Sequence, residues 1–460
     1  MTNQAFFGSF QRKTFEKTIR ILILLVVCTS SVSATDIING LLSVAHDVSD
    51  AKNGKDTRSR IEKDGTGSFS VGLTICFLTS LLRRCKHCIL QPMEPYRILV
   101  INPGSTSTKI SLFADMSCLF TESIFHDAPL LLQYPTTNDQ LPFRKQVVLD
   151  FLKAHSVTLS DIDVFVGRGG CAYSQPAGVM SIDERLVEDT KQDKGGSDHP
   201  AKLGVMLAWE LGSALGKPMF TVNPTNVDEL CDEARITGIA GLYRRAQTHV
   251  LNQKAVAREH ALRMGKRYED CDFIVCHIDG GITITAHRHG RMIDSTEGAG
   301  GDGPFSPTRL GSIPCIELAK YLETHTPEDI IRMCSRSGGF VSHFGTSNAD
   351  TIHALVERKD PKTTMVWKAM NYQICKSIGA MAAVLEGHVD GILLTGGLMR
   401  FEDITTTIQD HCSWIAPITV YPGEMEQEAM AEAVLKVLHH EDKAFTYSGK
   451  PVWTQFPWDQ

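Results

Sequence analysis

The sequence predicts an α/β fold of two lobes, and three observations support this prediction. From residue 97 onward, short apolar runs alternate with segments of helical periodicity, as in mixed sheets with flanking helices. The hairpin-like stretch ILVINPGSTSTKISLF (98–113) has a counterpart in CDFIVCHIDGGITITAHRHGRMID (271–294). In both, an apolar strand runs into a glycine turn and then into an alternating strand. A later strand, GILLTGG (391–397), also ends in a glycine turn. Two similar hairpins in one chain indicate two lobes of similar design that face one cleft.

The remaining elements follow from local patterns. Further strands are expected at 163–167 and 219–223, and helices at 199–216, 249–265 and 369–385. Gly216 and Pro218 end the first of these helices, because glycine favours the turn after a helix and proline cannot continue it. The predicted lobes span residues 93–265 and 266–460, and the second carries the later glycine turns.

Residues 1–92 differ from the rest in composition. They hold twelve Lys/Arg and seven Asp/Glu, although the 460-residue chain has a net charge of −7. Basic residues before ILILLVV (21–27), followed by SVSA (31–34), have the layout of a secretory signal. Three interpretations stay open: an export signal, a targeting or anchor extension, and a translation start assigned too far upstream. We prefer the third, with a poorly structured or spurious 1–92 and a domain that begins near Met93.

Composition excludes several classes of partner. The negative net charge disfavours nucleic acid and acidic membranes, and no membrane span is expected after residue 92. Thirteen scattered cysteines, an odd number, indicate a reducing compartment. The CxxC at 85–88 has no second pair at zinc spacing, so no metal site is expected there.

The glycine turns suggest anion binding. Turns of glycine and hydroxyl residues can direct several N–H and O–H groups at one phosphate, and small side chains allow close approach to the backbone. Two such turns from opposite lobes can hold the phosphates of ATP, and the third can accept the adenosine. The alternative is three ordinary turns, and the chain has neither a P-loop nor a dinucleotide-binding motif. The candidate residues are Asn102, Gly104, Ser105, Thr106, Ser107, Gly280, Gly281, Thr283, Thr395, Gly396 and Gly397.

Five motifs occur in an order that resembles the acetate/butyrate kinase family. They are NPGSTSTK (102–109), VGRGG (166–170), NQKAVAR (252–258), GPFSP (303–307) and LLTGG (393–397). The resemblance runs from about residue 96 to 440. It implies the two-lobed actin-like ATPase fold, of the ribonuclease H-like type, and a cytoplasmic homo-oligomer, a dimer or larger. The implied partners are ATP, Mg²⁺ and a short carboxylic acid, in the reaction butanoate + ATP = butanoyl phosphate + ADP.

The resemblance also implies roles for single residues. Arg168 and Arg309 match arginines at the acid and at the transferring phosphate. A carboxylate that attacks a phosphate brings like charges together, so such a site needs fixed positive charge. His249 matches a histidine that hydrogen-bonds the moving phosphoryl group, and His199 matches a second active-site histidine. Glu426, in YPGEMEQE (421–428), matches a glutamate of the magnesium shell, to which we also assign Asn102.

Several positions depart from the family pattern. Asn223, a fifth candidate catalytic residue, stands where an Asp is usual. A carboxylic acid is already ionised at pH 7, so the reaction can proceed without that base. Asp279 replaces the first glycine of the second turn, and Gly300, Lys202 and Thr248 replace a usual Asp, Asn and aromatic residue. These departures keep two alternatives open: a degenerate homologue that binds only nucleotide, and a kinase that prefers a branched-chain acid, propionate or acetate.

Overall fold

The first sheet begins with the antiparallel hairpin expected at residues 98–113. The computed structural model describes residues 94–105, 107–131, 133–196 and 199–459. In them, seven strands form a sheet in the order β12-β5-β6-β4-β1-β2-β3, in which β4 pairs parallel to β1. The strands are β1 (Arg97–Pro103), β2 (Ser107–Ala114), β3 (Ser117–Phe125), β4 (Val164–Gly167), β5 (Val179–Ser181), β6 (Met219–Val222) and β12 (Phe445–Thr446).

The second sheet repeats the arrangement of the first. Its order is β11-β10-β7-β8-β9, with an antiparallel meander on one side and parallel strands on the other. Both meanders shift register between their second and third strands, at Leu112/Phe113 and at Ala286/His287. The expected pair of similar lobes is therefore confirmed at the level of sheet topology. The strands are β7 (Asp272–Ile278), β8 (Ile282–Arg288), β9 (Arg291–Ser295), β10 (Gly391–Gly396) and β11 (Ile418–Pro422).

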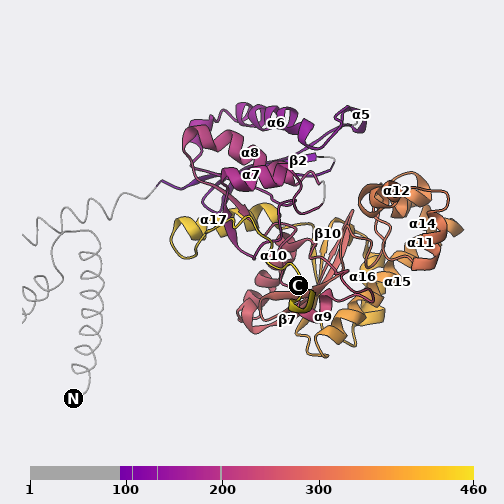
Figure 1. The fold of residues 1–460 in the computed structure, drawn as a ribbon. Helices are drawn as coiled ribbons and strands as arrows, with labels where there is room; N and C mark the ends of the chain where they lie inside the picture. The colour runs from indigo at the N-terminus through magenta and orange to yellow at the C-terminus, as the bar shows by residue number, and fades with distance from the viewer. Residues whose placement is uncertain (1–93, 106, 132, 197–198, 460) are drawn as a thin grey trace, which may run out of the picture. The chain divides into compact units, whose positions relative to one another are not determined.

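Helices cover both sheets on two faces (Figure 1). Before the second sheet begins they are α5 (Ala128–Leu131), α6 (Leu141–Ala154), α7 (Glu184–Lys191), α8 (Lys202–Gly212), α9 (Asp232–Arg235) and α10 (Val250–Arg263). After β9 they are α11 (Cys315–Tyr321), α12 (Pro327–Arg332), α13 (Gly339–Phe344), α14 (Ala349–Glu357), α15 (Pro361–Val384), α16 (Glu402–Cys412) and α17 (Glu426–Leu438). The first sheet lies between α6 and α8 on one face and α17 on the other. The second lies between α15 and α16 on one face and α10 on the other.

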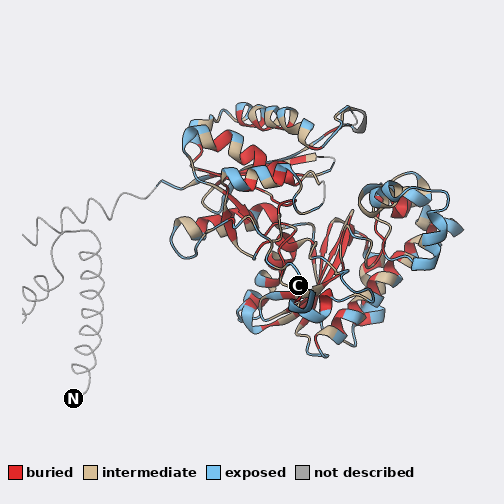
Figure 2. Ribbon diagram, viewed as in Figure 1, coloured by how far each residue is buried: buried red, intermediate tan, exposed pale blue. Residues whose placement is uncertain are grey.

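The burial of the central strands explains their sequences. From their second residue onward β1 and β7 are wholly buried, and β10 is buried throughout. A strand covered by helices on both faces needs apolar side chains on both, so it reads as a continuous apolar run instead of alternating. Figure 2 shows this as buried strands inside helices that are exposed along their outer sides. The core therefore follows directly from the runs that predicted the strands.

The C-terminal segment returns to the first sheet, which differs from the predicted second lobe of 266–460. Met430 and Val434 of α17 pack against apolar residues of β1 and β4, and β12 pairs with β5. The amphipathic pattern of α17 predicts a helix but not which sheet it covers. Residues 95–460 form one compact unit, and the prediction for 1–92 lies outside the described residues. Within the described part of the chain, no helix is both long and apolar enough to cross a bilayer.

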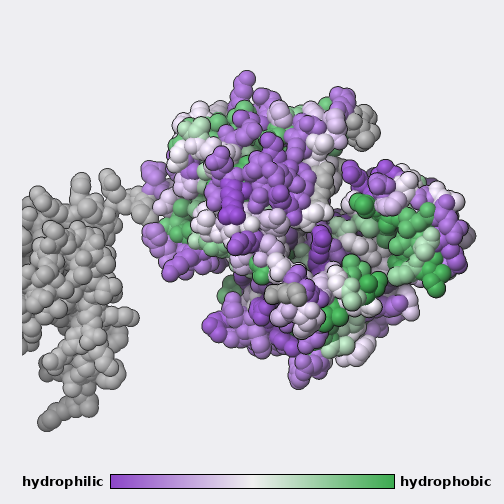
Figure 3. All heavy atoms as spheres, in the orientation of Figure 1, coloured by the Kyte–Doolittle hydropathy of each residue, from purple (hydrophilic) through white to green (hydrophobic). Residues whose placement is uncertain are grey.

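An exposed apolar surface covers α11 and α12 (Figure 3). Ile316 and Ile331 are 72% and 67% exposed. A cavity of about 480 Å³ lies beneath this surface, between Phe305, Leu318 and Met333. Exposed apolar patches of this kind are typical of interaction surfaces.

Candidate active site

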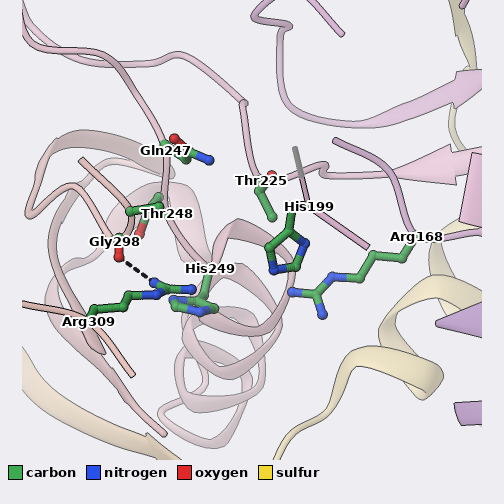
Figure 4. A pocket seen from close by; sticks show the side chains of 9 residues that line it. Arg168, His199, Thr225, Gln247, Thr248, His249, Gly298 and Arg309 are labelled. Carbon is green, nitrogen blue, oxygen red and sulfur yellow. Dashed lines mark hydrogen bonds between the residues drawn. The ribbon is translucent and has the colours of Figure 1, made fainter. Parts of the chain in front are cut away.

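A small pocket brings together four of the five residues predicted to be catalytic (Figure 4). The four are Arg168, His199, His249 and Arg309, and the cavity measures about 40 Å³. This is room for about three water molecules, the scale of a small carboxylate. The other lining residues are Thr225, Gln247, Thr248, Gly298 and Ala299.

Two helices begin beside this pocket. His249 directly precedes α10, and His199 lies shortly before α8. Helix N-termini carry partial positive charge and N–H groups without helical partners, which favours anions. Glycines allow α8 to start against the end of β4, because a Cβ on Gly167 would lie 2.0 Å from the carbonyl oxygen of Gly204. This close approach brings His199 next to Arg168, the residue that follows β4.

Arg168 lies in a buried polar cluster with two other predicted residues. Its Nη2 is 2.9 Å from Oε1 of Glu426, and its Nη1 donates to Oδ1 of Asn102 at 3.3 Å. The Asn102 amide donates to the other Glu426 oxygen at 2.7 Å. Burial raises the pKa of Glu426, and the charge of Arg168 opposes that rise. The cluster orients the Arg168 guanidinium from both sides.

Arg309 occupies space that two glycines leave open. A Cβ on Gly281 would lie 2.3 Å from the Arg309 Cζ, and one on Gly298 would lie 2.6 Å from Nη1. Burial and the nearby charge of Arg168 lower the pKa of Arg309 to about 10, so it stays cationic at neutral pH. Its Nε has no hydrogen-bond partner among the described residues. Two guanidinium groups at one pocket create a positive potential that an anion would relieve.

His249 is held by Thr283 and stacked on a second histidine. Its Nδ1 lies 2.8 Å from the Thr283 hydroxyl, and its ring stacks on that of His277 at 3.9 Å between centroids. Burial first, and the charges of His277 and Arg309 second, lower the pKa of His249 well below its ordinary value. The imidazole is therefore neutral at physiological pH. In His199, Nδ1 accepts the N–H of Ala201 at 3.1 Å.

Acid should destabilise the fold through such buried histidines. Burial lowers the pKa of His287, as of His249, well below its usual value. Below pH 6.5 the unfolded chain therefore binds protons that the folded chain does not, and each group costs about 1.4 kcal/mol per pH unit. We expect the free energy of unfolding, measured with urea, to fall between pH 6.5 and 5. The His287→Phe variant should show a slope shallower by that amount, and an unchanged slope would contradict this prediction.

Asn223 is placed differently from the other candidate catalytic residues. It does not line the pocket; its side-chain oxygen accepts the N–H of Gly178 at 2.8 Å, and its φ is +41°. Lys202, another departure from the family pattern, is buried with its ammonium 2.8 Å from Asp193. Gly300 faces the carboxylate of Glu297, which a Cβ would approach to 2.1 Å. These residues support the backbone around the pocket instead of lining it.

The first turn is braced by an arginine. Gly104 donates its N–H to the Ser107 carbonyl at 2.8 Å. The fully buried Arg144 donates to the carbonyl oxygens of Gly104 and Ser107, at 3.0 and 2.6 Å, and to the Thr108 hydroxyl. Ser105 is exposed at the tip, and Thr106 lies outside the described residues. Arg144 therefore fixes the backbone of the turn by binding its carbonyl oxygens.

Replacing Arg144 by methionine should cost about 3 kcal/mol of stability. The change removes a buried guanidinium and leaves the carbonyl oxygen of Gly104 without its donor and that of Ser107 with one donor fewer, at about 1–3 kcal/mol for an unsatisfied group. Lys145→Met is the matched control, because Lys145 pairs with Glu210 on the surface and such pairs contribute at most about 1 kcal/mol. Urea unfolding at pH 7 measures both. Equal losses in the two variants would contradict the bracing role.

Asp279 joins the second turn to the third. Its Oδ1 accepts the N–H of Gly280, and its Oδ2 accepts the N–H of Gly397, both at 2.7 Å. Gly281, also in the second turn, makes room for Arg309. The carboxylate therefore occupies N–H donors that the sequence assigns to a phosphate and to adenosine.

The third turn is held by buried hydrogen bonds. The Thr395 hydroxyl donates to the Gly423 carbonyl at 2.9 Å and accepts from Asn252 at 3.1 Å. Gly396 has φ +107°, and a Cβ there would meet the Ile278 backbone at 2.3 Å. Only glycine fits at that position.

The predicted magnesium ligands are engaged with each other and with Arg168. A different group, His277, Asp279 and Glu424, brings one ligand atom from each residue within 4.8 Å of the others. Burial and the charge of Asp279 raise the pKa of Glu424. Two carboxylates match the oxygen donors that Mg²⁺ prefers. Asp279 and Glu424 therefore fit a magnesium ion better than the predicted pair of Glu426 and Asn102.

Sequence reasoning missed several residues that shape the site. Arg144 lies in an amphipathic helix, where a buried arginine leaves no local signal. Glu424 lies in the stretch YPGEMEQE (421–428), two residues before Glu426, the glutamate predicted to bind magnesium. Gly298 lies in a loop before GPFSP (303–307). A glycine is required there because a Cβ would clash with the Arg309 guanidinium, which only the tertiary structure shows.

Known proteins match both the sequence and the fold. Residues 239–419 match the sequence model of the acetokinase family. Among solved structures, acetate kinase from Porphyromonas gingivalis has a TM-score of 0.62 at 18% identity, over 75% of this chain and 100% of that one. A propionate kinase from Francisella tularensis has 0.61 at 16%, over 74% and 98%. Acetate kinase from Entamoeba histolytica has 0.58 at 16%, over 72% and 97%.

The solved structures support the fold class, and the sequence match supports the family. At these identities, structural similarity establishes a mixed α/β fold with two sheets of the actin-like ATPase type, as predicted. The family match includes two of the four predicted catalytic residues at the pocket, His249 and Arg309. Over residues 239–419 the chain is therefore similar in sequence to the acetokinase family.

Proposed function

We propose that the protein transfers the γ-phosphoryl group of ATP to a short-chain carboxylic acid, with butanoate as the acid and butanoyl phosphate and ADP as products. The observation that supports this most is the pocket in which Arg168 and Arg309 meet beside His249 and His199. A carboxylate and a phosphoryl group are both anions, and this pocket concentrates positive charge where they must approach each other.

The reaction needs charge compensation more than proton transfer. A carboxylate oxygen attacks the γ-phosphorus, an O–P bond forms, and the bond to the bridging oxygen breaks, with its electron pair leaving on ADP. Arg168 and Arg309 offset the negative charge of the attacking and transferring groups. Because Arg168 is paired with Glu426 at 2.9 Å, its guanidinium is already oriented before substrate arrives. No general base is required, which agrees with Asn223 bonding to the backbone of Gly178.

The nucleotide and the metal are assigned to the other side of the pocket. The first turn and residues Gly280 and Gly281 would hold the phosphates, and Thr395 to Gly397 the adenosine. Asp279 and Glu424 would hold Mg²⁺, which when bound offsets charge on the phosphate oxygens. The neutral His249 would hydrogen-bond the transferring group.

The decisive experiment is an acyl-kinase assay on the full-length chain. Butanoate, ATP, Mg²⁺ and hydroxylamine should yield acyl hydroxamate, with acetate, propionate and isobutyrate run in parallel to rank the acids. One methylene contributes only about 1–3 kcal/mol of discrimination, so neighbouring acids should also react. Arg168→Ala is the control that should lack activity. Product no greater than in that control, together with a thermal shift by ADP, would support the nucleotide-binding alternative instead.

We further propose that the enzyme works in the cytoplasm as a homo-oligomer. None of the nine described cysteines forms a disulfide, which suits a reducing compartment. The exposed apolar surface on α11 and α12 (Figure 3) offers a contact area. Light scattering during gel filtration tests the oligomeric state, and a monomer at micromolar concentration would contradict it.

A further inference from the structure

A chain of buried side chains leads from Tyr268 to His249. The Tyr268 hydroxyl lies 2.7 Å from Nδ1 of His287, and Nε2 of His287 lies 3.2 Å from Oε1 of Gln253. The Gln253 amide nitrogen lies 2.7 Å from the Thr283 hydroxyl, which lies 2.8 Å from Nδ1 of His249. Tyr268, His287, Gln253 and Thr283 are at most 4% exposed. Because these side chains are buried, the position of each proton is determined by the hydrogen-bond partners within the protein.

The first half of this chain has one consistent proton arrangement. The Gln253 nitrogen also faces the Thr283 carbonyl at 3.3 Å, and a carbonyl only accepts, so the amide orientation is settled. Its oxygen therefore faces His287, and Nε2 of His287 must carry a proton. Burial keeps His287 neutral by lowering its pKa well below the usual value. Nδ1 of His287 is then an acceptor, and Tyr268 donates to it.

In the second half of the chain, from Thr283 to His249, the arrangement is determined by the one proton that the Thr283 hydroxyl can donate. The Thr283 oxygen accepts an N–H from Gln253. Its other hydrogen-bond partner among the described residues is Nδ1 of His249. If that nitrogen carried the proton, the Thr283 hydroxyl would have no acceptor, and an unsatisfied buried donor is costly. Thr283 therefore donates to Nδ1 of His249.

We propose that this chain holds His249 in the tautomer with its proton on Nε2, so that the ring presents an N–H donor to an anion in the pocket. Thr283, Gln253, His287 and Tyr268 are positioning residues that act through His249. The use of that N–H in phosphoryl transfer rests on the proposed function, whereas the tautomer itself does not.

The tautomer of His277, the ring stacked on His249, is determined in the same way by the side-chain amide of Asn252. The Asn252 nitrogen donates to Nδ1 of His277 at 3.0 Å. Its orientation is settled because the Asn252 oxygen accepts the N–H of Met425 at 2.9 Å. Nε2 of His277 then carries a proton and lies 3.6 Å from the Glu424 carboxylate. A protonated Nε2 cannot ligate a metal, which leaves the carboxylates of Asp279 and Glu424 as the ligands for a cation.

The tautomers can be read by nitrogen NMR. The full-length protein is labelled with ring-¹⁵N histidine, and long-range proton–nitrogen correlations are recorded at pH 7.5, with His249→Gln and His277→Gln spectra for assignment. Each of the two rings should show an unprotonated Nδ1 and a protonated Nε2. A protonated Nδ1 on His249 would overturn the proposal. An Nε2–H tautomer in a protein without acyl-kinase turnover would uphold it and reject the proposed function.

A matched pair of variants tests the positioning role. Thr283→Val removes the hydroxyl at nearly constant shape, and Thr283→Ser retains it. In the valine variant the His249 nitrogens should show two interconverting tautomers, and kcat should fall at least tenfold with KM for the acid little changed. The serine variant should keep the wild-type nitrogen shifts and recover most of kcat. Wild-type shifts in a folded valine variant would overturn the proposal. If that variant fails to fold, the wild-type spectrum alone decides.

Discussion

Replacing Arg309 by methionine should lower acyl-phosphate formation at least a thousandfold without lowering the thermal midpoint. Groups that stabilise charge in a transition state contribute about 10²–10³ each, and here the loss also removes one of two cations at the pocket. The same cation is costly in the resting protein, because burial and Arg168 both lower its pKa. Sites strained for function commonly gain stability when the strained group is removed.

Two measurements separate catalysis from folding in this variant. The hydroxamate assay gives kcat, and calorimetry gives the midpoint with and without inorganic phosphate. Phosphate should raise the wild-type midpoint more than that of the variant, because an anion that binds only the folded state stabilises it. Arg358→Met makes the same chemical change at an exposed position and should alter neither quantity. A large fall in the midpoint of Arg309→Met would show that Arg309 serves the fold.

Replacing Asp279 by glycine should strengthen the binding of metal-free ADP by tenfold or more. The carboxylate accepts the N–H groups of Gly280 and Gly397, and its charge lies where a phosphate is expected. At 4 Å, two unit charges repel by about 1 kcal/mol in water and by about 4 kcal/mol near a protein surface. Removing Asp279 frees both donors and abolishes the repulsion.

With Mg²⁺ present, the wild type should bind ADP more tightly than Asp279→Gly. A cation held by Asp279 would offset the charge of this carboxylate and attract the phosphates. We expect wild-type affinity for ADP, measured by titration calorimetry, to depend strongly on Mg²⁺, and that of Asp279→Gly to depend on it weakly. Asp279→Asn removes the charge but retains one acceptor, so its metal-free affinity should lie between the two. Weaker binding of metal-free ADP by the glycine variant would contradict the displacement of phosphate donors by Asp279.

The local elements could be predicted because their causes are local. The strand at 272–278 and the helix at 249–265 were expected from apolar runs and helical periodicity, and β7 and α10 agree within two residues. The repeated hairpins predicted the repeated sheet topology, since a meander of three strands needs only short turns. In contrast, the residues of α17 that pack against the first sheet lie more than 300 positions after β1 in the sequence. No local pattern carries that information.

The site was predicted in part, for a related reason. Arg168, His249 and Arg309 were recognised by motif and meet at one pocket. Glu426 was recognised too, yet as a magnesium ligand, whereas its oxygens face Asn102 and Arg168. Whether a carboxylate binds a metal, an arginine or an amide depends on distances of a few tenths of an ångström. Such distances follow only from packing.

The sequence by itself therefore determined the strands, the paired hairpins, the glycine turns and the residue types that make a positively charged pocket. These depend on side-chain periodicity and backbone freedom, which neighbouring residues specify. Only the tertiary structure decided that the carboxylate of Asp279 points into its own turns, that Arg144 braces the first turn, and that Thr283 orients His249. Apart from the bond between Asp279 and its neighbour Gly280, these are hydrogen bonds between segments distant in the sequence. Burial selects their donors and acceptors, because every buried polar group must find a partner.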